Sequence, residues 1–75
     1  MNRDVTFTEQ GELEDLIDAA GLDNVLLAIE QVCMDKADHA EINWQDSRLA
    51  LAWIGASNRI NNARGEIRES VGELP

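Results

Sequence analysis

The most reactive side chains of this 75-residue chain belong to a single cysteine, Cys33, and a single histidine, His39. Together they could serve as metal ligands. Six positions along a helix separate two side chains by about 240°, however, so one ion cannot bind both. Asp35 lies four residues before His39 and shares its helical face, but the sequence has no second histidine and no Glu-x-x-His motif of the helical-bundle metal proteins. The sequence therefore predicts no metal site and no cofactor.

Catalysis by the thiol or by an acid and base pair is also disfavoured. A catalytic cysteine needs a neighbouring base or a helix N-terminus that favours the thiolate, whereas Cys33 stands in the middle of an apolar stripe. The chain has no tyrosine, no glycine-rich phosphate loop and no pair of carboxylates on an apolar wall. We therefore expect Cys33 to be a small buried core residue, and we expect that the chain is not an enzyme.

One cation falls on the apolar stripe of the same segment, at Lys36. In the helix pairing derived below, it faces Trp53, and a cation–π contact there would contribute about 0.5 to 2 kcal/mol. Alternatively, the aliphatic stem lies along the indole while the ammonium group reaches water or Asp35. We favour the second arrangement.

Charge is distributed unevenly along the chain, whose net charge is −9. Residues 1–46 hold twelve acids and two bases, whereas residues 47–75 hold three acids and four arginines. Direct contact with nucleic-acid phosphates requires clustered lysine and arginine side chains, so nucleic-acid binding is disfavoured. No apolar run is long enough to span a bilayer, and the first ten residues lack the apolar core of a signal peptide. We expect one small helical domain over residues 1–75, located in the cytoplasm and without membrane contact.

Hydrophobic spacing predicts an all-α fold of three segments. The first eight residues alternate apolar and polar side chains, which indicates an extended arm. A short helix over about residues 12–20 ends at Gly21, and a second helix over about 23–41 has Asp23 as its N-cap. A third helix over about 46–70 is capped by Asp46 or Ser47. The short connection between the second and third helices makes them an antiparallel hairpin.

The apolar stripes of these two helices set the predicted register. Folding the chain back at Trp44 places Ile29 against Ile60, with Cys33 close to Ala56. The third-helix stripe has spacings of 4 and 3, which is typical of a heptad-like seam. It consists of Leu49, Trp53, Ala56, Ile60, Ala63 and Ile67.

Four apolar residues point away from this seam and need another cover: Leu27, Met34, Leu51 and Ile54. A chain of this length buries only about 60% of the surface exposed by its unfolded form, so it is marginal as a monomer. The cover is expected to be the first helix or a second copy of the chain. Our preferred assembly is a symmetric dimer with a four-helix core.

Acidic residues crowd the first helix and continue along the second, and the simplest interpretation is a solvated surface. A sharper interpretation is that the carboxylates imitate nucleic-acid phosphates and occupy a basic groove on another protein. The residues chosen for that contact are Glu12, Asp15, Asp38 and Glu41.

The segments from Cys33 to His39, from Asn43 to Asp46 and from Leu49 to Trp53 resemble small uncharacterised helical proteins of bacteria and their mobile elements. The resemblance covers about a third of the chain. It implies that the protein comes from a bacterium or a phage, and it gives no activity that can be transferred to this chain. From the residues themselves, we expect a non-enzymatic protein–protein interaction module that self-associates to a homo-oligomer. The alternative is an acidic inhibitor, of the kind that phages and mobile elements use against host defence, that blocks a basic nucleic-acid-binding protein.

Overall fold

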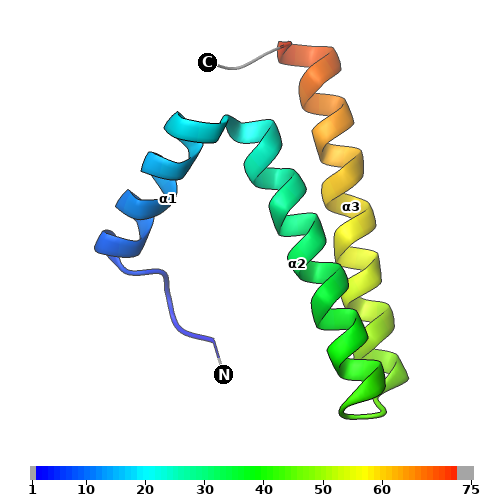
Figure 1. The fold of residues 1–75 in the computed structure, drawn as a ribbon. Helices are drawn as coiled ribbons and strands as arrows, with labels where there is room; N and C mark the ends of the chain where they lie inside the picture. The colour runs from blue at the N-terminus through cyan, green and yellow to red at the C-terminus, as the bar shows by residue number, and fades with distance from the viewer. Residues whose placement is uncertain (1, 73–75) are drawn as a thin grey trace.

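The computed structural model describes residues 2–72, which form three helices and no strand. The helices are α1 (Phe7–Ala20), α2 (Leu22–Ile42) and α3 (Ser47–Val71) (Figure 1). α2 and α3 pack against each other as an antiparallel hairpin. The prediction of an all-helical fold with this hairpin is confirmed. None of the three helices combines the length and hydrophobicity needed to cross a bilayer.

α1 begins five residues before its predicted start at residue 12, because a capping box ends the extended arm at Thr6. The Thr6 hydroxyl accepts a hydrogen bond from the backbone N–H of Glu9, and the Glu9 carboxylate accepts one from the backbone N–H of Thr6. Arg3 donates two further hydrogen bonds to this carboxylate, at 2.7 and 2.8 Å. Only residues 2–6 of the predicted eight-residue arm are therefore non-helical.

The predicted role of Asp23 as an N-cap is wrong. α2 starts at Leu22, and Gly21 is the only residue between α1 and α2. Gly21 has φ +88° and ψ 150°, a conformation that L side chains rarely adopt. Asp23 therefore lies within the first turn of α2, where its side chain is available for another interaction.

The hairpin turn closes largely as predicted. Asp46 is the N-cap of α3, and its carboxylate accepts a hydrogen bond from the backbone N–H of Leu49. The backbone N–H of Asp46 donates to the carbonyl oxygen of Ala40 at 2.9 Å, which ties the two helix ends together. Between them, Gln45 occupies the left-handed region with φ +49°.

Small side chains make the contact between α2 and α3. Ala37, Ala40 and Ala50 form the buried cluster near the turn, and Leu49, Trp53 and Ile54 pack against it. Lys36 is exposed, so the predicted stripe is wrong at this position, and the neighbouring Ala37 is buried in the cluster instead. Among the described residues, no large side chain is fully buried. The hairpin core is therefore thin.

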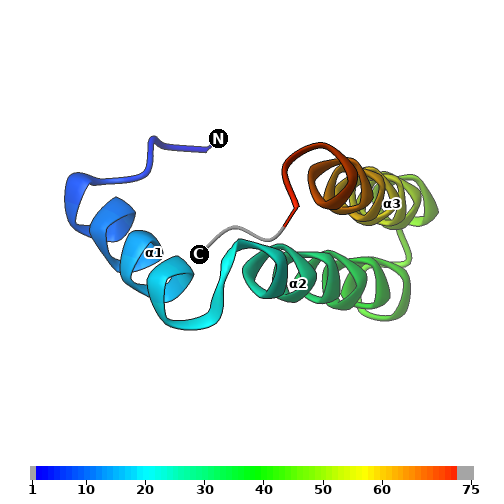
Figure 2. The same ribbon diagram turned by 90° about the horizontal axis from the view of Figure 1, so that it is seen from above.

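α1 does not complete a three-helix bundle. From Gly21 it diverges from α2, and in the view from above it stands to one side of the hairpin, apart from α3 (Figures 1 and 2). Within residues 2–72 it contacts α2 but not α3, and it contains no buried residue. The hairpin is thus left with one side uncovered.

Candidate protein-interaction surface

The apolar side of α1 is accessible. Leu13, Leu16 and Ile17 recur at helical spacing, and Leu13 and Leu16 are exposed while Ile17 is half-buried. Phe7, at the start of the helix, is 93% exposed. A helix with this pattern normally buries its apolar stripe against a neighbour, and α1 does not.

The hairpin presents a second apolar surface. On α3 the most buried positions are Ala50 and Ser57, and Ile60 and Ile67 lie about 60 to 100° around the helix from these two residues. On α2, the exposed Val32 is likewise displaced to one side of the buried positions, whereas Ile29 is exposed although it falls between Val25 and Ala40 around the helix. In an antiparallel pair these two displacements fall on the same face of the hairpin. The pairing of Ile29 against Ile60 stays a prediction, and neither side chain is buried within the described chain.

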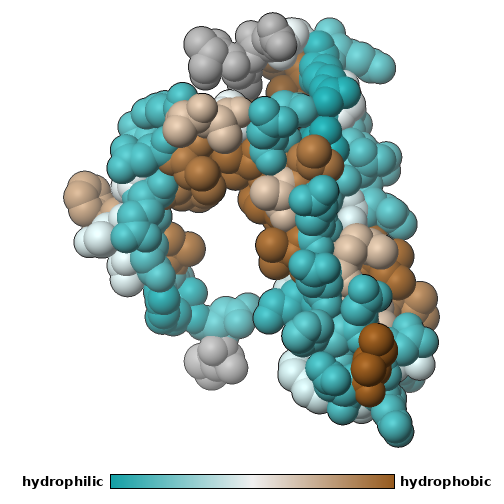
Figure 3. All heavy atoms as spheres, in the orientation of Figure 1, coloured by the Kyte–Doolittle hydropathy of each residue, from teal (hydrophilic) through white to brown (hydrophobic). Residues whose placement is uncertain are grey.

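The two apolar surfaces face each other across an opening. Figure 3 shows hydrophobic atoms on both sides of this opening, between α1 and the hairpin. We define the open face as six of the larger apolar side chains of the three helices, none of which is buried. These are Leu13 and Leu16 of α1, Ile29 and Val32 of α2, and Ile60 and Ile67 of α3.

A smaller apolar surface lies on the other side of the hairpin, and three of the four predicted docking residues belong to it. Leu27, Met34 and Leu51, here called the outer patch, are exposed, and Leu51 is 66% exposed. Ile54 is half-buried against the hairpin core, so the prediction that it points away is wrong. α1 does not touch α3 among the described residues, and it therefore leaves Leu51 uncovered.

The four predicted acidic contact residues are all exposed but lie on two helices. Glu12 and Asp15 belong to α1, and Asp38 and Glu41 belong to the last turns of α2. α1 and α2 diverge from Gly21, so the two pairs are separated by the opening (Figure 1). None of the four takes part in an ion pair within residues 2–72.

Other acids are paired with arginines at the end of the hairpin away from the turn. Arg64 of α3 donates to both Asp23 and Glu30 of α2, and Arg68 donates to Asp23 at 2.8 Å. The side chains of Arg64 and Glu30 are only 12% and 13% exposed. Next to them, the Ser57 hydroxyl donates to the carbonyl oxygen of Glu30 at 3.4 Å. This cluster joins α2 to α3 where the alanine core does not reach.

The Asp23 carboxylate makes the stability of the hairpin sensitive to acid. Hydrogen bonds from Arg68 and then Arg64 lower the pKa of Asp23 from 3.8 to about 2. A carboxyl whose pKa is lower in the folded state contributes stability above its unfolded pKa and loses it as the pH falls towards the folded pKa. We expect the urea midpoint of the wild-type chain to fall between pH 4 and pH 2. In Asp23→Asn this decrease should be smaller, and an unchanged decrease would contradict the assignment.

A shallow polar depression of about 520 Å³ runs along the same end of α3. All of its lining residues come from this helix, so no second element encloses it. Its two cations, Arg64 and Arg68, are the ones that hold Asp23.

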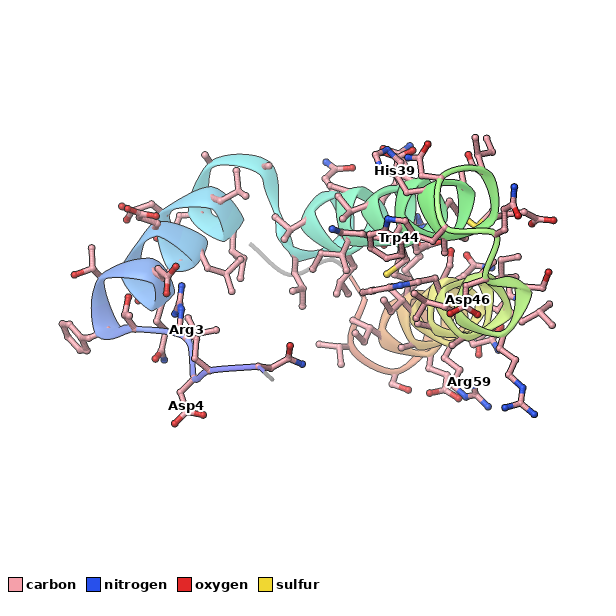
Figure 4. The ribbon with its side chains drawn as sticks, turned by 90° about the horizontal axis from the view of Figure 1, so that it is seen from below. Arg3, Asp4, His39, Trp44, Asp46 and Arg59 are labelled. Carbon is pink, nitrogen blue, oxygen red and sulfur yellow. The ribbon has the colours of Figure 1, made fainter. Side chains whose placement is uncertain are left out.

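The structure does not bring Cys33 and His39 together. Cys33 is buried in the hairpin, whereas His39 lies on the side of α2 turned away from α3 (Figure 4). Arg59 lies on the outer side of α3, away from α2 (Figure 4). Within residues 2–72 there is no cluster of three or more histidine, cysteine or acidic side chains that could hold a metal ion.

No protein-family model matches the chain, and comparisons with curated proteins and with solved structures found no match. The surfaces described above are therefore the basis for a functional proposal.

Proposed function

We propose that this chain is a non-enzymatic protein–protein interaction module that self-associates through its open face. The observation that carries the proposal is the uncovered apolar surface: α1 contains no buried residue, and the hairpin face opposite it exposes Ile29 and Val32. Contiguous exposed apolar surface on a small protein is typical of an interaction site.

The composition of the hairpin core supports this proposal. The buried hydrophobic residues are one valine, one cysteine and three alanines, so little apolar surface is removed from water inside the described chain. Burial of a leucine, isoleucine or valine side chain contributes about 1.5 to 3 kcal/mol. Covering the open face would therefore add substantially to the stability of a domain of this size.

Introducing a charge into the open face tests the proposal. Val32 is 53% exposed, so Val32→Glu is compatible with the single chain but would bury a carboxylate in the assembly. We expect the wild type to be a dimer by light scattering, and we expect Val32→Glu to weaken association roughly 100-fold or more. A matched control is Gln31→Glu, which adds the same charge on an exposed neighbouring position.

The same measurement separates the two apolar surfaces. If Leu51→Glu dissociates the dimer and Val32→Glu does not, the outer patch is the interface and the open face is not. If the wild type is monomeric at high micromolar concentration, the proposed self-association is wrong.

The acidic inhibitor remains a second candidate, because the exposed acids Glu12, Asp15, Asp38 and Glu41 lie outside the arginine cluster. Binding to a basic protein would weaken with salt, since charges are screened beyond about 8 Å at physiological ionic strength. Reversal of all four to lysine should abolish such binding while association through the apolar open face largely survives. If no basic protein binds the wild type in a salt-dependent manner, this candidate is wrong.

A further inference from the structure

We propose that the α2 and α3 part of the open face is occupied by α1 of a second copy, so that two chains exchange their N-terminal helices. This inference rests on the self-association proposed above and names the segment that provides it. In the exchanged dimer, the Leu13 and Leu16 side of one α1 packs on the Ile29, Val32, Ile60 and Ile67 side of the other hairpin.

The connection between α1 and α2 is the first argument for a second copy. Antiparallel helices that pack side by side are normally joined by two to five residues. Here Gly21 alone connects Ala20 to Leu22, and the two helices diverge from it (Figure 1). A connection this short prevents α1 from lying flat on its own hairpin, and short hinges favour exchange of an element between copies.

Charge is the second argument. α1 carries five acids and no base: Glu9, Glu12, Glu14, Asp15 and Asp18. Its neighbour α2 is also acidic, with five acids and a single base, Lys36. α3 carries four arginines and two acids. The net charge of α3 is therefore opposite to that of α1, although Arg64 and Arg68 are already paired with α2 and Arg59 lies on the outer side of α3. Contact between α1 and α3 does not occur within the described chain.

The local structure of α1 is the third argument. Its N-terminus is fixed by the Thr6 and Glu9 capping box and by Arg3, and both partners of that ion pair lie outside the hairpin. The helix is thus stabilised by local contacts and can move as a unit. At its other end, the positive φ of Gly21 is a conformation that L side chains rarely adopt, and a Cβ added there would meet no atom within 4 Å.

Cross-linking between chains that each contain one cysteine tests the exchange. In a Cys33→Ala background, Leu16→Cys places the thiol on the apolar side of α1, and Ala63→Cys places it on the Ile60 side of α3. After the two variants are mixed, a short bis-maleimide should join unlike chains, as identified by mass spectrometry. The matched control replaces Leu16→Cys with Asp18→Cys, on the opposite side of α1, and should give little product.

The outcomes distinguish this inference from the proposed function. Dimers by light scattering without cross-links between unlike chains would overturn the exchange and leave self-association intact. Monomers would overturn both. Efficient cross-linking within one chain of the double variant Leu16→Cys/Ala63→Cys at low concentration would show that α1 covers its own hairpin, and the exchange would be wrong.

The hinge provides an independent test. Alanine is strained at the φ of Gly21 but is favoured in a continuous helix, so Gly21→Ala should direct α1 away from its own hairpin. We expect Gly21→Ala to tighten dimerisation roughly fivefold. The control is Gly11→Ala, whose added Cβ would also meet no atom within 4 Å. It increases helix propensity within α1 and should leave the dimerisation constant nearly unchanged. Equal or weaker dimerisation of Gly21→Ala would contradict the hinge role.

Discussion

Replacing Ala40 with leucine is expected to lower the free energy of unfolding by about 1 to 3 kcal/mol, because the larger side chain must separate the two helices of the hairpin. Ala40 has no exposed surface and packs with Ala37 and Ala50. Its carbonyl oxygen also accepts the hydrogen bond that closes the turn. Urea unfolding followed by circular dichroism would measure the change.

The matched control is Ala28→Leu, which makes the same substitution at an exposed position of the same helix. Surface substitutions usually change stability by less than about 0.5 kcal/mol. Equal stability of the two variants would show that α2 and α3 are not in close contact at the alanine cluster.

The number and order of the helices could be predicted from the sequence because apolar periodicity and capping residues are local signals. Asp46 was identified as a cap for this reason. The start of α1 was missed because the alternation of Val5 and Phe7 suggested an extended strand-like segment. The spacing of Thr6 and Glu9 is the capping-box signal that outweighs this alternation.

The apolar stripes did not predict how far each helix of the hairpin is rotated about its own axis. Each stripe is wider than one helix contact, so several of its residues could have formed the centre. Small side chains allow the closest approach of two helices, and Ala37, Ala40, Ala50 and Ser57 therefore occupy the contact. The bulkier Val32 and Ile60 are turned to one side of this contact, and both belong to the open face.

The position of α1 depends on a single residue. Periodicity predicts a short helix that ends at Gly21, but it does not give the angle at which the chain continues. Since no turn residue other than Gly21 separates α1 from α2, the backbone dihedrals of this glycine determine the direction in which α1 leaves the hairpin. The exposed apolar residues of α1, Leu13 and Leu16, were consequently not singled out from the sequence.

The arginine cluster was missed although the predicted register contained it. In that register Asp23 faces the turn of α3 between Arg64 and Arg68, so its pairing could have been inferred once the hairpin was accepted. The assignment of Asp23 as an N-cap concealed this possibility. The structure instead uses Asp23 and Glu30 to hold the end of the hairpin that lacks an apolar core.

Arg64→Met is therefore expected to destabilise the hairpin more than any single surface change. The substitution leaves Glu30, whose side chain is 13% exposed, without its cation and removes one of the two arginines that hold Asp23. Removal of one partner of a largely buried ion pair is strongly destabilising because the remaining charge is desolvated without compensation. We expect the melting temperature to fall by roughly 10 °C or more, measured by circular dichroism.

A second substitution distinguishes loss of the ion pair from loss of packing. In Arg64→Met/Glu30→Leu both members of the pair are replaced by apolar side chains, and most of the melting temperature should be recovered because no unpaired charge remains at that position. Arg59→Met is the matched control, since Arg59 lies on the outer side of α3 and belongs to none of the ion pairs of residues 2–72. It should leave the melting temperature nearly unchanged. If the double variant is as unstable as Arg64→Met, the aliphatic packing of Arg64 rather than its charge holds this end of the hairpin together.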